Sequence, residues 1–214
     1  MTNHVPDFVV LLGPDYAGKS SAMSELAVSG WPWRLVSVDD ALLPPAYPVI
    51  AGLRRHLLRD VLSAPAGTYS PDFTASLLQT AAVHLRDRLV EPGDDRPVLV
   101  DSYYYKLLAK CRLTGSPEHP LFAWWRSFPQ PRGVVYLDVD PATAWSRSGA
   151  GAATNRLEHY GERVDEASFR AFQTDLRVAM LTEVRHLDLV EIQQQGSPAD
   201  TADTVRKVLS DEFR

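Results

Sequence analysis

The sequence has 214 residues, 45% of them hydrophobic, and its formal net charge is −5, which is ordinary for a globular protein. The length is enough for one α/β domain with a sizeable core. The acidic balance gives no global attraction to nucleic acid or to an anionic membrane, and the single cysteine, Cys111, excludes an internal disulfide bond. We therefore expect one domain, residues 1–214, in a cytoplasmic protein that has neither nucleic acid nor membrane as a partner.

Five apolar runs predict β-strands. They cover residues 8–12, 33–38, 98–101, 133–139 and 187–192. Apolar spacing and capping residues predict helices between and after these strands. The first helix ends near residue 29, and the others span residues 50–62, 71–90, 102–113, 118–128, 141–147, 165–184 and 198–213. Alternating strands and helices predict an α/β fold, with a five-stranded parallel sheet flanked by helices. Ligands of such a sheet gather at the carboxyl ends of the strands.

A glycine-rich stretch follows the first strand. Residues 13–20, Gly-Pro-Asp-Tyr-Ala-Gly-Lys-Ser, match the pattern G-x-x-x-x-G-K-[ST] of the P-loop, or Walker A motif. A strand before it and a helix after it are the context that this motif needs, and a plain glycine turn explains the full match less well. We expect Lys19 to bind the β- and γ-phosphates of ATP and Ser20 to be a ligand of Mg²⁺. The candidate ATP-binding residues are Gly13, Asp15, Tyr16, Ala17, Gly18, Lys19, Ser20 and Ser21.

Acidic residues stand at the ends of two other predicted strands. Asp101 ends the apolar run 98–101 and is predicted to organise Mg²⁺ together with Ser20. Asp39 and Asp40 end the second strand, where a carboxylate can bind a substrate hydroxyl or take its proton; the alternative is a solvated turn. Asp15 lies inside the P-loop, where an acid does not help to bind phosphate, so we expect it to accept a hydrogen bond from an acceptor hydroxyl.

A small-residue segment, 148–154, has the composition of a mobile lid. Arg147 and Arg156 flank it, and we expect this lid, residues 147–158, to close both arginines on ATP and the transferring phosphoryl group. The alternative is that both are ordinary surface residues. Lys106 lies one helical turn beyond Ser102 and could face the same site, although a solvated lysine is the plainer interpretation.

Taken together, these observations predict catalytic and acceptor-binding sets. The catalytic candidates are Lys19, Arg147, Arg156, Asp39 and Asp40, and the acceptor-binding candidates are Asp15, Asp39, Arg55, Phe73, Asp101, Tyr103 and Lys106. Phe73 and Tyr103 could contact a ring, but aromatic residues are core residues by default. The six histidines show no metal-ligand spacing, so Ser20 and Asp101 are the only metal ligands predicted.

Several segments in the same order resemble those of the thymidylate kinases. The P-loop is similar to that of the family, which carries an acid at the position of Asp15 that meets the 3′-hydroxyl of the nucleotide sugar. Residues 50–58 resemble its second helix, with Arg55 as the match to the helix arginine, and residues 70–78 resemble the start of its third helix. Residues 136–147 resemble the strand and helix before the lid, and residues 155–158 resemble the lid motif Asp-Arg-x-Glu. The resemblance implies a P-loop kinase fold, ATP and Mg²⁺, a dTMP-like nucleoside monophosphate as acceptor, and a homodimer.

The chain departs from that family on the acceptor side. Ser102 stands where the family has the arginine of Asp-Arg-Tyr, the third-helix arginine is missing from residues 79–84, and Asp39–Pro45 replaces Arg-Glu-Pro-Gly-Gly. Burying an acceptor phosphate without its arginines is costly. Three hypotheses follow: a nucleoside monophosphate kinase in which Lys106 and Arg55 replace the lost arginines; a kinase of an uncharged hydroxyl compound, such as a nucleoside or a natural-product intermediate, with Asp39 or Asp40 as base; and an ATP-binding regulatory protein without phosphoryl transfer.

Overall fold

A five-stranded parallel sheet forms the centre of the protein. The computed structural model describes residues 6–90, 94–193 and 196–213. The strands β1 (Phe8–Leu12), β2 (Arg34–Val36), β3 (Val98–Asp101), β4 (Gly133–Asp138) and β5 (Asp188–Gln193) lie in the order β2-β3-β1-β4-β5. β1 pairs with β3 through Phe8 and Val98 and with β4 through Val9 and Gly133, always in parallel. The predicted five-stranded parallel sheet is thus confirmed.

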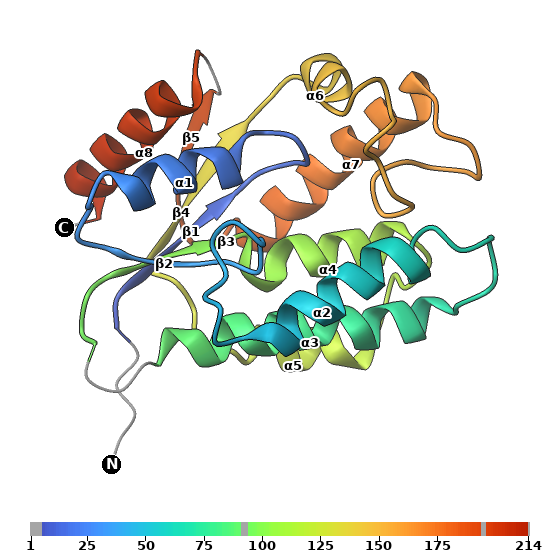
Figure 1. The fold of residues 1–214 in the computed structure, drawn as a ribbon, viewed down its shortest axis with the longest axis horizontal. Helices are drawn as coiled ribbons and strands as arrows, with labels where there is room; N and C mark the ends of the chain where they lie inside the picture. The colour runs from blue at the N-terminus through green and yellow to red at the C-terminus, as the bar shows by residue number, and fades with distance from the viewer. Residues whose placement is uncertain (1–5, 91–93, 194–195, 214) are drawn as a thin grey trace.

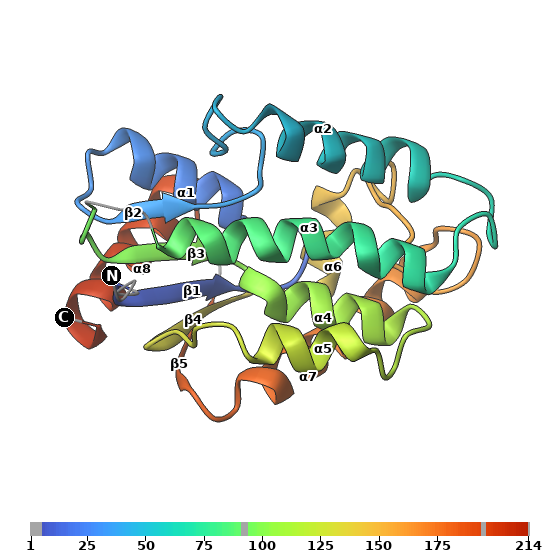
Figure 2. The same ribbon diagram turned by 90° about the horizontal axis from the view of Figure 1, so that it is seen from below.

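Helices cover both faces of this sheet (Figures 1 and 2). α1 (Lys19–Val28) and α8 (Pro198–Glu212) pack together on one face. On the other face α3 (Pro71–Leu89), α4 (Tyr103–Leu113) and α7 (Glu166–Val184) form the main layer, and α2 (Pro48–His56) packs on α3. The shorter helices are α5 (Pro120–Arg126), α6 (Pro141–Arg147), which packs on α7, and a π-helical segment, η1 (Leu57–Val61), which continues α2.

The central strand divides the core into two layers. Successive side chains of a strand point to opposite faces. Val10 and Leu12 pack into the layer of α3, α4 and α7, whereas Val9 and Leu11 pack into the layer of α1 and α8. All four are essentially inaccessible to solvent. A strand buried on both faces must be apolar at every position, which is why the continuous apolar runs predicted the inner strands so well.

The predicted helices are present, with small differences at their ends. The predicted helix 50–62 is observed as α2 followed by the π-helical turn η1. Ser102 occupies the predicted cap position of α4, but it has a φ of 60° and its side chain makes no capping hydrogen bond. The Ser102 hydroxyl instead donates to the Asp101 carboxylate at 2.8 Å.

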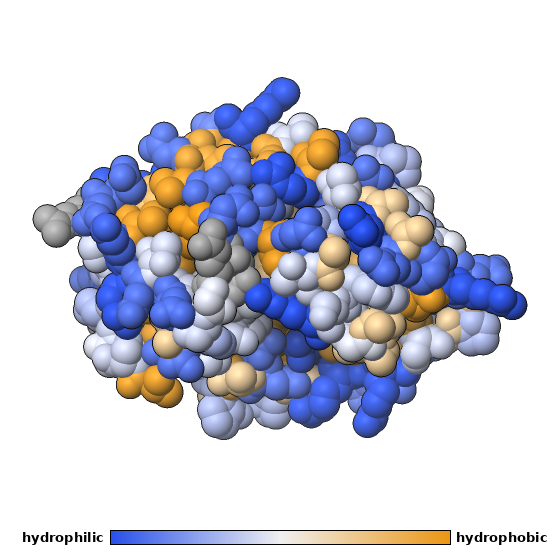
Figure 3. Space-filling view, turned by 90° about the horizontal axis from the view of Figure 1, so that it is seen from above, coloured by the Kyte–Doolittle hydropathy of each residue, from blue (hydrophilic) through white to orange (hydrophobic). Residues whose placement is uncertain are grey.

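The surface seen in Figure 3 has hydrophobic areas that hydrophilic side chains interrupt. None of the helices in the described ranges has both the length and the apolar character needed to cross a membrane.

Candidate active site

The P-loop connects β1 to α1 at the carboxyl edge of the sheet. A Cβ atom on Gly13 would lie 2.3 Å from the carbonyl oxygen of Leu137, so only glycine lets the loop pass this close to β4. Gly18 has a φ of 91° and occupies the N-cap position of α1. The loop therefore brings the start of α1 to the strand ends, where unpaired backbone N–H groups and the helix dipole favour an anion.

Lys19 is the first residue of α1, and its side chain folds back over the loop. The ammonium group donates hydrogen bonds to the carbonyl oxygens of Gly13 and Pro14, both at 3.0 Å, and only 7% of the residue is exposed. Burial, together with the positive charge of Lys106, lowers the pKa of Lys19 to about 7. The negative charges of Asp101 and Asp15 offset this lowering only in part, so the Lys19 cation is stabilised further when an anion binds beside it.

A cavity of about 660 Å³ lies over the P-loop, at the carboxyl ends of the strands. P-loop residues 15–21 form its floor, and Arg147 together with the lid residues Ala153, Asn155 and Glu158 borders it. The remaining walls come from the ends of β2 and β3, from α2 and α4, and from the start of α8: Asp39, Arg54, Leu58, Asp101, Ser102, Lys106, Gly196, Pro198 and Thr201.

Three oxygen-bearing side chains gather on one side of this cavity. The Ser20 hydroxyl donates to the Asp39 carboxylate at 3.2 Å. Ser37 links the two acids, because its hydroxyl donates to Asp101 at 2.9 Å and accepts from the backbone N–H of Asp39 at 3.0 Å. Ser20, Asp39 and Asp101 all line the cavity. The Ser20 hydroxyl and the Asp101 carboxylate are oxygen ligands of the kind that Mg²⁺ prefers, so these two residues fit the predicted ion, and Asp39 adjoins them.

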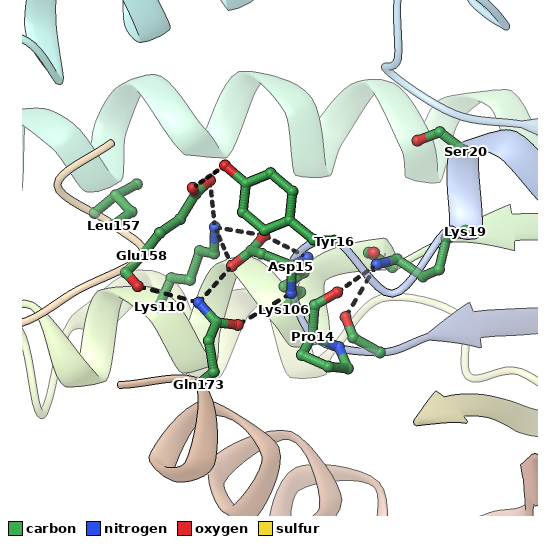
Figure 4. Close-up of polar contacts among 12 residues, drawn as sticks. Pro14, Asp15, Tyr16, Lys19, Ser20, Lys106, Lys110, Leu157, Glu158 and Gln173 are labelled. Atoms are coloured by element: carbon green, nitrogen blue, oxygen red, sulfur yellow. Dashed lines mark hydrogen bonds and ion pairs between the residues drawn. The ribbon is translucent and has the colours of Figure 1, made fainter. Parts of the chain in front are cut away.

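Asp15 is the centre of a buried cluster of charges (Figure 4). Its carboxylate lies 2.7 Å from the ammonium of Lys106 and 3.0 Å from that of Lys110, and it accepts a hydrogen bond of 3.3 Å from Gln173. Burial alone would raise the pKa of Asp15, but the two ammonium groups outweigh it and hold the pKa below the ordinary value. An acceptor hydroxyl would have to displace one of these partners before it could bind Asp15 as predicted.

The segment predicted to be a lid, residues 147–158, is joined to the P-loop through Tyr16. Its hydroxyl lies 2.8 Å from the Ala153 carbonyl oxygen and 2.9 Å from the Glu158 carboxylate, and these two acceptors share its one proton. Asn155 donates to the other oxygen of Glu158 at 2.6 Å, and Arg147 donates to the Tyr16 carbonyl at 3.1 Å. Burial and the nearby Glu158 charge raise the pKa of Tyr16, so its hydroxyl remains a donor. The lid therefore contacts the loop through several side chains.

Most of the predicted site residues line this one cavity. They are Asp15, Tyr16, Ala17, Gly18, Lys19, Ser20, Ser21, Asp39, Asp101, Lys106 and Arg147, and Gly13 lies at the start of the same loop. Asp40 does not line it, because its carboxylate points to Arg54 at 3.1 Å and is 48% exposed. Asp39 is therefore the better placed of the two candidate bases.

Four further predicted residues do not line this cavity in the structure. Arg55 is exposed on α2, and its neighbour Arg54 lines the cavity instead. Arg156 donates to the carbonyl of Val61 at 3.3 Å, at the end of η1 and away from the P-loop cavity.

The other two are aromatic. Phe73 is 44% exposed and stacks on Tyr69 in the first turn of α3. Tyr103 is fully buried in the core beside Phe8, and its hydroxyl donates to the Pro129 carbonyl. The default interpretation of aromatic residues as core residues holds for Tyr103. Neither side chain lines the cavity, so neither is assigned to the acceptor.

The prediction of site residues missed three that the structure brings to the loop: Ser37, Lys110 and Gln173. Lys110 lies four residues after Lys106, so both side chains share one face of α4, and this spacing was a usable signal. Gln173 is 2% exposed on the apolar face of α7, four residues after the buried Phe169. A polar residue at an otherwise apolar position of a helix is the signal that could have revealed it.

Comparisons with known proteins add one finding. The sequence matches no family model and no curated protein. Among solved structures, the fold is similar to that of a thymidylate kinase from Candida albicans, with a TM-score of 0.59 and 15% sequence identity over 96% of this chain and 91% of that one. At this identity the likeness concerns the fold, and with the parallel sheet and the P-loop it gives the chain a thymidylate kinase-like P-loop kinase fold.

Proposed function

We propose that the protein is an ATP-dependent phosphotransferase that transfers the γ-phosphoryl group of ATP to an acceptor hydroxyl. The observation that carries this proposal is the convergence of Lys19, Ser20, Asp39 and Asp101 on one cavity over a P-loop. Phosphoryl transfer needs positive charge at the phosphates, oxygen ligands for Mg²⁺ and a group that receives a proton, and these residue types supply all three.

Each residue then has a distinct role. The start of α1 and the Lys19 ammonium bind the β- and γ-phosphates, and Arg147, which also lines the cavity, adds a second cation. Ser20 and Asp101 would hold Mg²⁺, and the bound ion would neutralise negative charge on the phosphates. Asp39 accepts the proton of the attacking hydroxyl, and the lid excludes water from the transfer.

The fold resemblance implies a nucleoside monophosphate, such as dTMP, as acceptor, but the charges favour an acceptor without a phosphate. Lys106 is paired with Asp15 at 2.7 Å, and Arg54 with Asp40 at 3.1 Å and Asp39 at 3.5 Å. An acceptor dianion would have to draw Lys106 away from the buried Asp15, which would then keep only Lys110 as an ionic partner, and Arg54 away from Asp39 and Asp40. A neutral alcohol leaves them intact, so an uncharged hydroxyl compound is the acceptor that we favour.

The third hypothesis is an ATP-binding regulatory protein that transfers no phosphoryl group. Such a protein needs no carboxylate beside the Ser20 hydroxyl to receive a proton. The contact between Ser20 and Asp39 supports the enzyme over that alternative.

The function is tested with radiolabelled ATP and an acceptor panel of thymidine monophosphate, thymidine and neutral alcohols. We expect transfer to at least one neutral acceptor and a loss of several orders of magnitude in Lys19→Ala, with the fold retained by circular dichroism. Lys207→Ala, an exposed lysine on α8, is the matched control and should keep full activity. Unchanged transfer in Lys19→Ala would refute the proposal, and ATP binding without transfer to any acceptor would favour the regulatory alternative.

A further inference from the structure

A second, mainly aliphatic cavity adjoins the P-loop cavity. It has a volume of about 160 Å³ and lies between α2, η1, α3, α4 and the lid. Leu53 of α2, Leu57 of η1, Leu77 of α3 and Leu107 of α4 face it. Arg54, Leu58, Asn155 and Glu158 line both cavities, so the two spaces meet at these residues.

The ionic groups at the cavity wall are already compensated within the protein. The Lys110 ammonium contacts Asp15 at 3.0 Å and Glu158 at 3.6 Å, and Arg54 is paired with Asp39 and Asp40. The walls thus present aliphatic surface together with charge pairs that need no further partner. This environment rejects a phosphate dianion, whose charge would be buried without a free cation.

The residues that line the cavity also argue against a nucleobase as its ligand. Among the described residues that line it, none is aromatic, so no ring is offered for a base to stack on. A water molecule finds few hydrogen-bond partners in an aliphatic cavity, and an empty cavity lowers the stability of the folded protein. A cavity at this place is therefore best explained by an apolar ligand that fills it. Its wall includes Leu57 and Leu58 from the π-helical turn η1, a type of turn that is frequent at functional sites.

We propose that this cavity binds the apolar body of the acceptor, which is a compact, uncharged alcohol. An apolar cavity of about 150 Å³ holds a benzene-sized ligand, so the buried part of the acceptor has roughly six carbon atoms. Its hydroxyl would reach the P-loop cavity past Arg54 and Leu58, on the side where Asp39 lies. This inference rests on the proposed phosphotransferase function and narrows its acceptor from any neutral hydroxyl compound to an apolar one.

The transfer step balances without a further reactant. The acceptor oxygen forms a bond to the γ-phosphorus of ATP, the bond from that phosphorus to the β–γ bridging oxygen breaks, and ADP leaves with the bond electrons. The hydroxyl proton goes to the Asp39 carboxylate and then to solvent. The products are ADP and the phosphate monoester of the alcohol.

The experiment compares benzyl alcohol and cyclohexylmethanol with glycerol, thymidine and thymidine monophosphate. Binding to the protein is followed by saturation-transfer NMR without ATP, and phosphorylation is followed with radiolabelled ATP. Ala81→Leu adds volume inside the cavity from α3, and Leu58→Gln, at a position that is already 37% exposed, makes its mouth polar. Ala171→Leu, the same substitution at an exposed position of α7, is the matched control.

We expect both apolar alcohols to bind and to be phosphorylated, with a KM at least about tenfold higher in Ala81→Leu or Leu58→Gln and an unchanged KM for ATP. The control should match the unmodified protein. Preference for thymidine monophosphate or glycerol would overturn the inference while leaving the phosphotransferase proposal intact. If no acceptor is phosphorylated, the proposed phosphotransferase function fails. Binding of the apolar alcohols that is lost in Ala81→Leu would still support the inference that this cavity binds an apolar alcohol. Absence of alcohol binding, or equal binding by all variants, would overturn the inference.

Discussion

Tyr16 in the P-loop donates a hydrogen bond of 2.9 Å to Glu158 in the lid, across 142 residues of sequence. Tyr16 has a φ of 59°, a conformation that is unusual for a tyrosine, and this conformation accompanies the contact of its hydroxyl with the lid. Because Glu158 lines both the P-loop cavity and the aliphatic cavity, the contact couples the phosphate-binding loop to the space proposed for the acceptor.

Removal of the Tyr16 hydroxyl should loosen the lid. Tyr16→Phe removes the hydrogen bonds to the Ala153 carbonyl and to the Glu158 carboxylate, which keeps Asn155 and Lys110 as partners, and such a loss costs about 1 kcal/mol. We expect a lower free energy of unfolding in urea and faster amide hydrogen exchange in residues 150–158. Tyr160→Phe is the matched control, because that hydroxyl donates at 2.8 Å to the exposed Asp175. Equal exchange of the lid in the two variants would contradict a specific role for Tyr16.

The two acids after β2 should differ sharply in their importance for turnover. Asp39 contacts Ser20 at 3.2 Å and lines the P-loop cavity, whereas Asp40 is exposed and paired with Arg54. Loss of a general base lowers turnover by about 10²–10⁴-fold, so Asp39→Asn should show a loss in this range. Asp40→Asn removes a carboxylate from the same turn and should change kcat by less than about threefold, as expected when a surface ion pair is lost. Steady-state kinetics with the best acceptor of the panel would measure both, and similar losses in the two variants would exclude Asp39 as the base.

The fold and the P-loop could be predicted from sequence because their signals are local. Each inner strand is buried on both faces and is therefore a continuous apolar run, and the P-loop motif lies within eight consecutive positions, Gly13 to Ser20. Asp39 and Asp101 could be named as candidates for the same reason, since Asp101 is the last residue of β3 and Asp39 follows the end of β2.

The partners of Asp15 could not be predicted in this way. Lys110 is 95 residues away in sequence and Gln173 is 158 residues away, so their contacts depend on how α4 and α7 pack on the sheet. Residue type was equally uninformative for the two arginines of α2. Only the direction of the helix decides that Arg54 faces the cavity and that Arg55 is exposed.

The charge cluster around Asp15 should stabilise the folded protein and respond to acid. Asp15→Asn leaves Lys106 and Lys110 without their shared carboxylate, and breaking a buried ion pair from one side costs about 3–5 kcal/mol. Because the pKa of Asp15 is lowered in the folded state, its contribution is present above the ordinary value of 3.8 and is lost as the pH falls through the folded value. The unmodified protein should therefore lose stability below about pH 4 more steeply than the variant does.

Urea unfolding between pH 3 and pH 7 would measure this difference. Asp203→Asn is the matched control, because Asp203 pairs with Arg206 at 2.7 Å on the exposed face of α8 and its side chain is 69% exposed. A pair so close to solvent contributes little to stability. If the two variants lose the same free energy, the cluster at Asp15 does not have the strength that its burial implies.

The lowered pKa of Lys19 predicts that the proposed ATP binding depends on pH in the neutral range. Without nucleotide, Lys19 begins to lose its proton near pH 7, whereas phosphate oxygens beside it favour the charged form. Above the pKa of the free protein, binding must therefore take up a proton, and the Kd for ATP should rise by up to about tenfold per pH unit. Titration calorimetry at pH 8 in buffers of different ionisation enthalpy would detect this uptake. Lys19→Arg keeps a cation that stays protonated throughout this pH range, so its binding should show less proton uptake and a weaker pH dependence. Identical proton uptake in the two proteins would show that another group titrates.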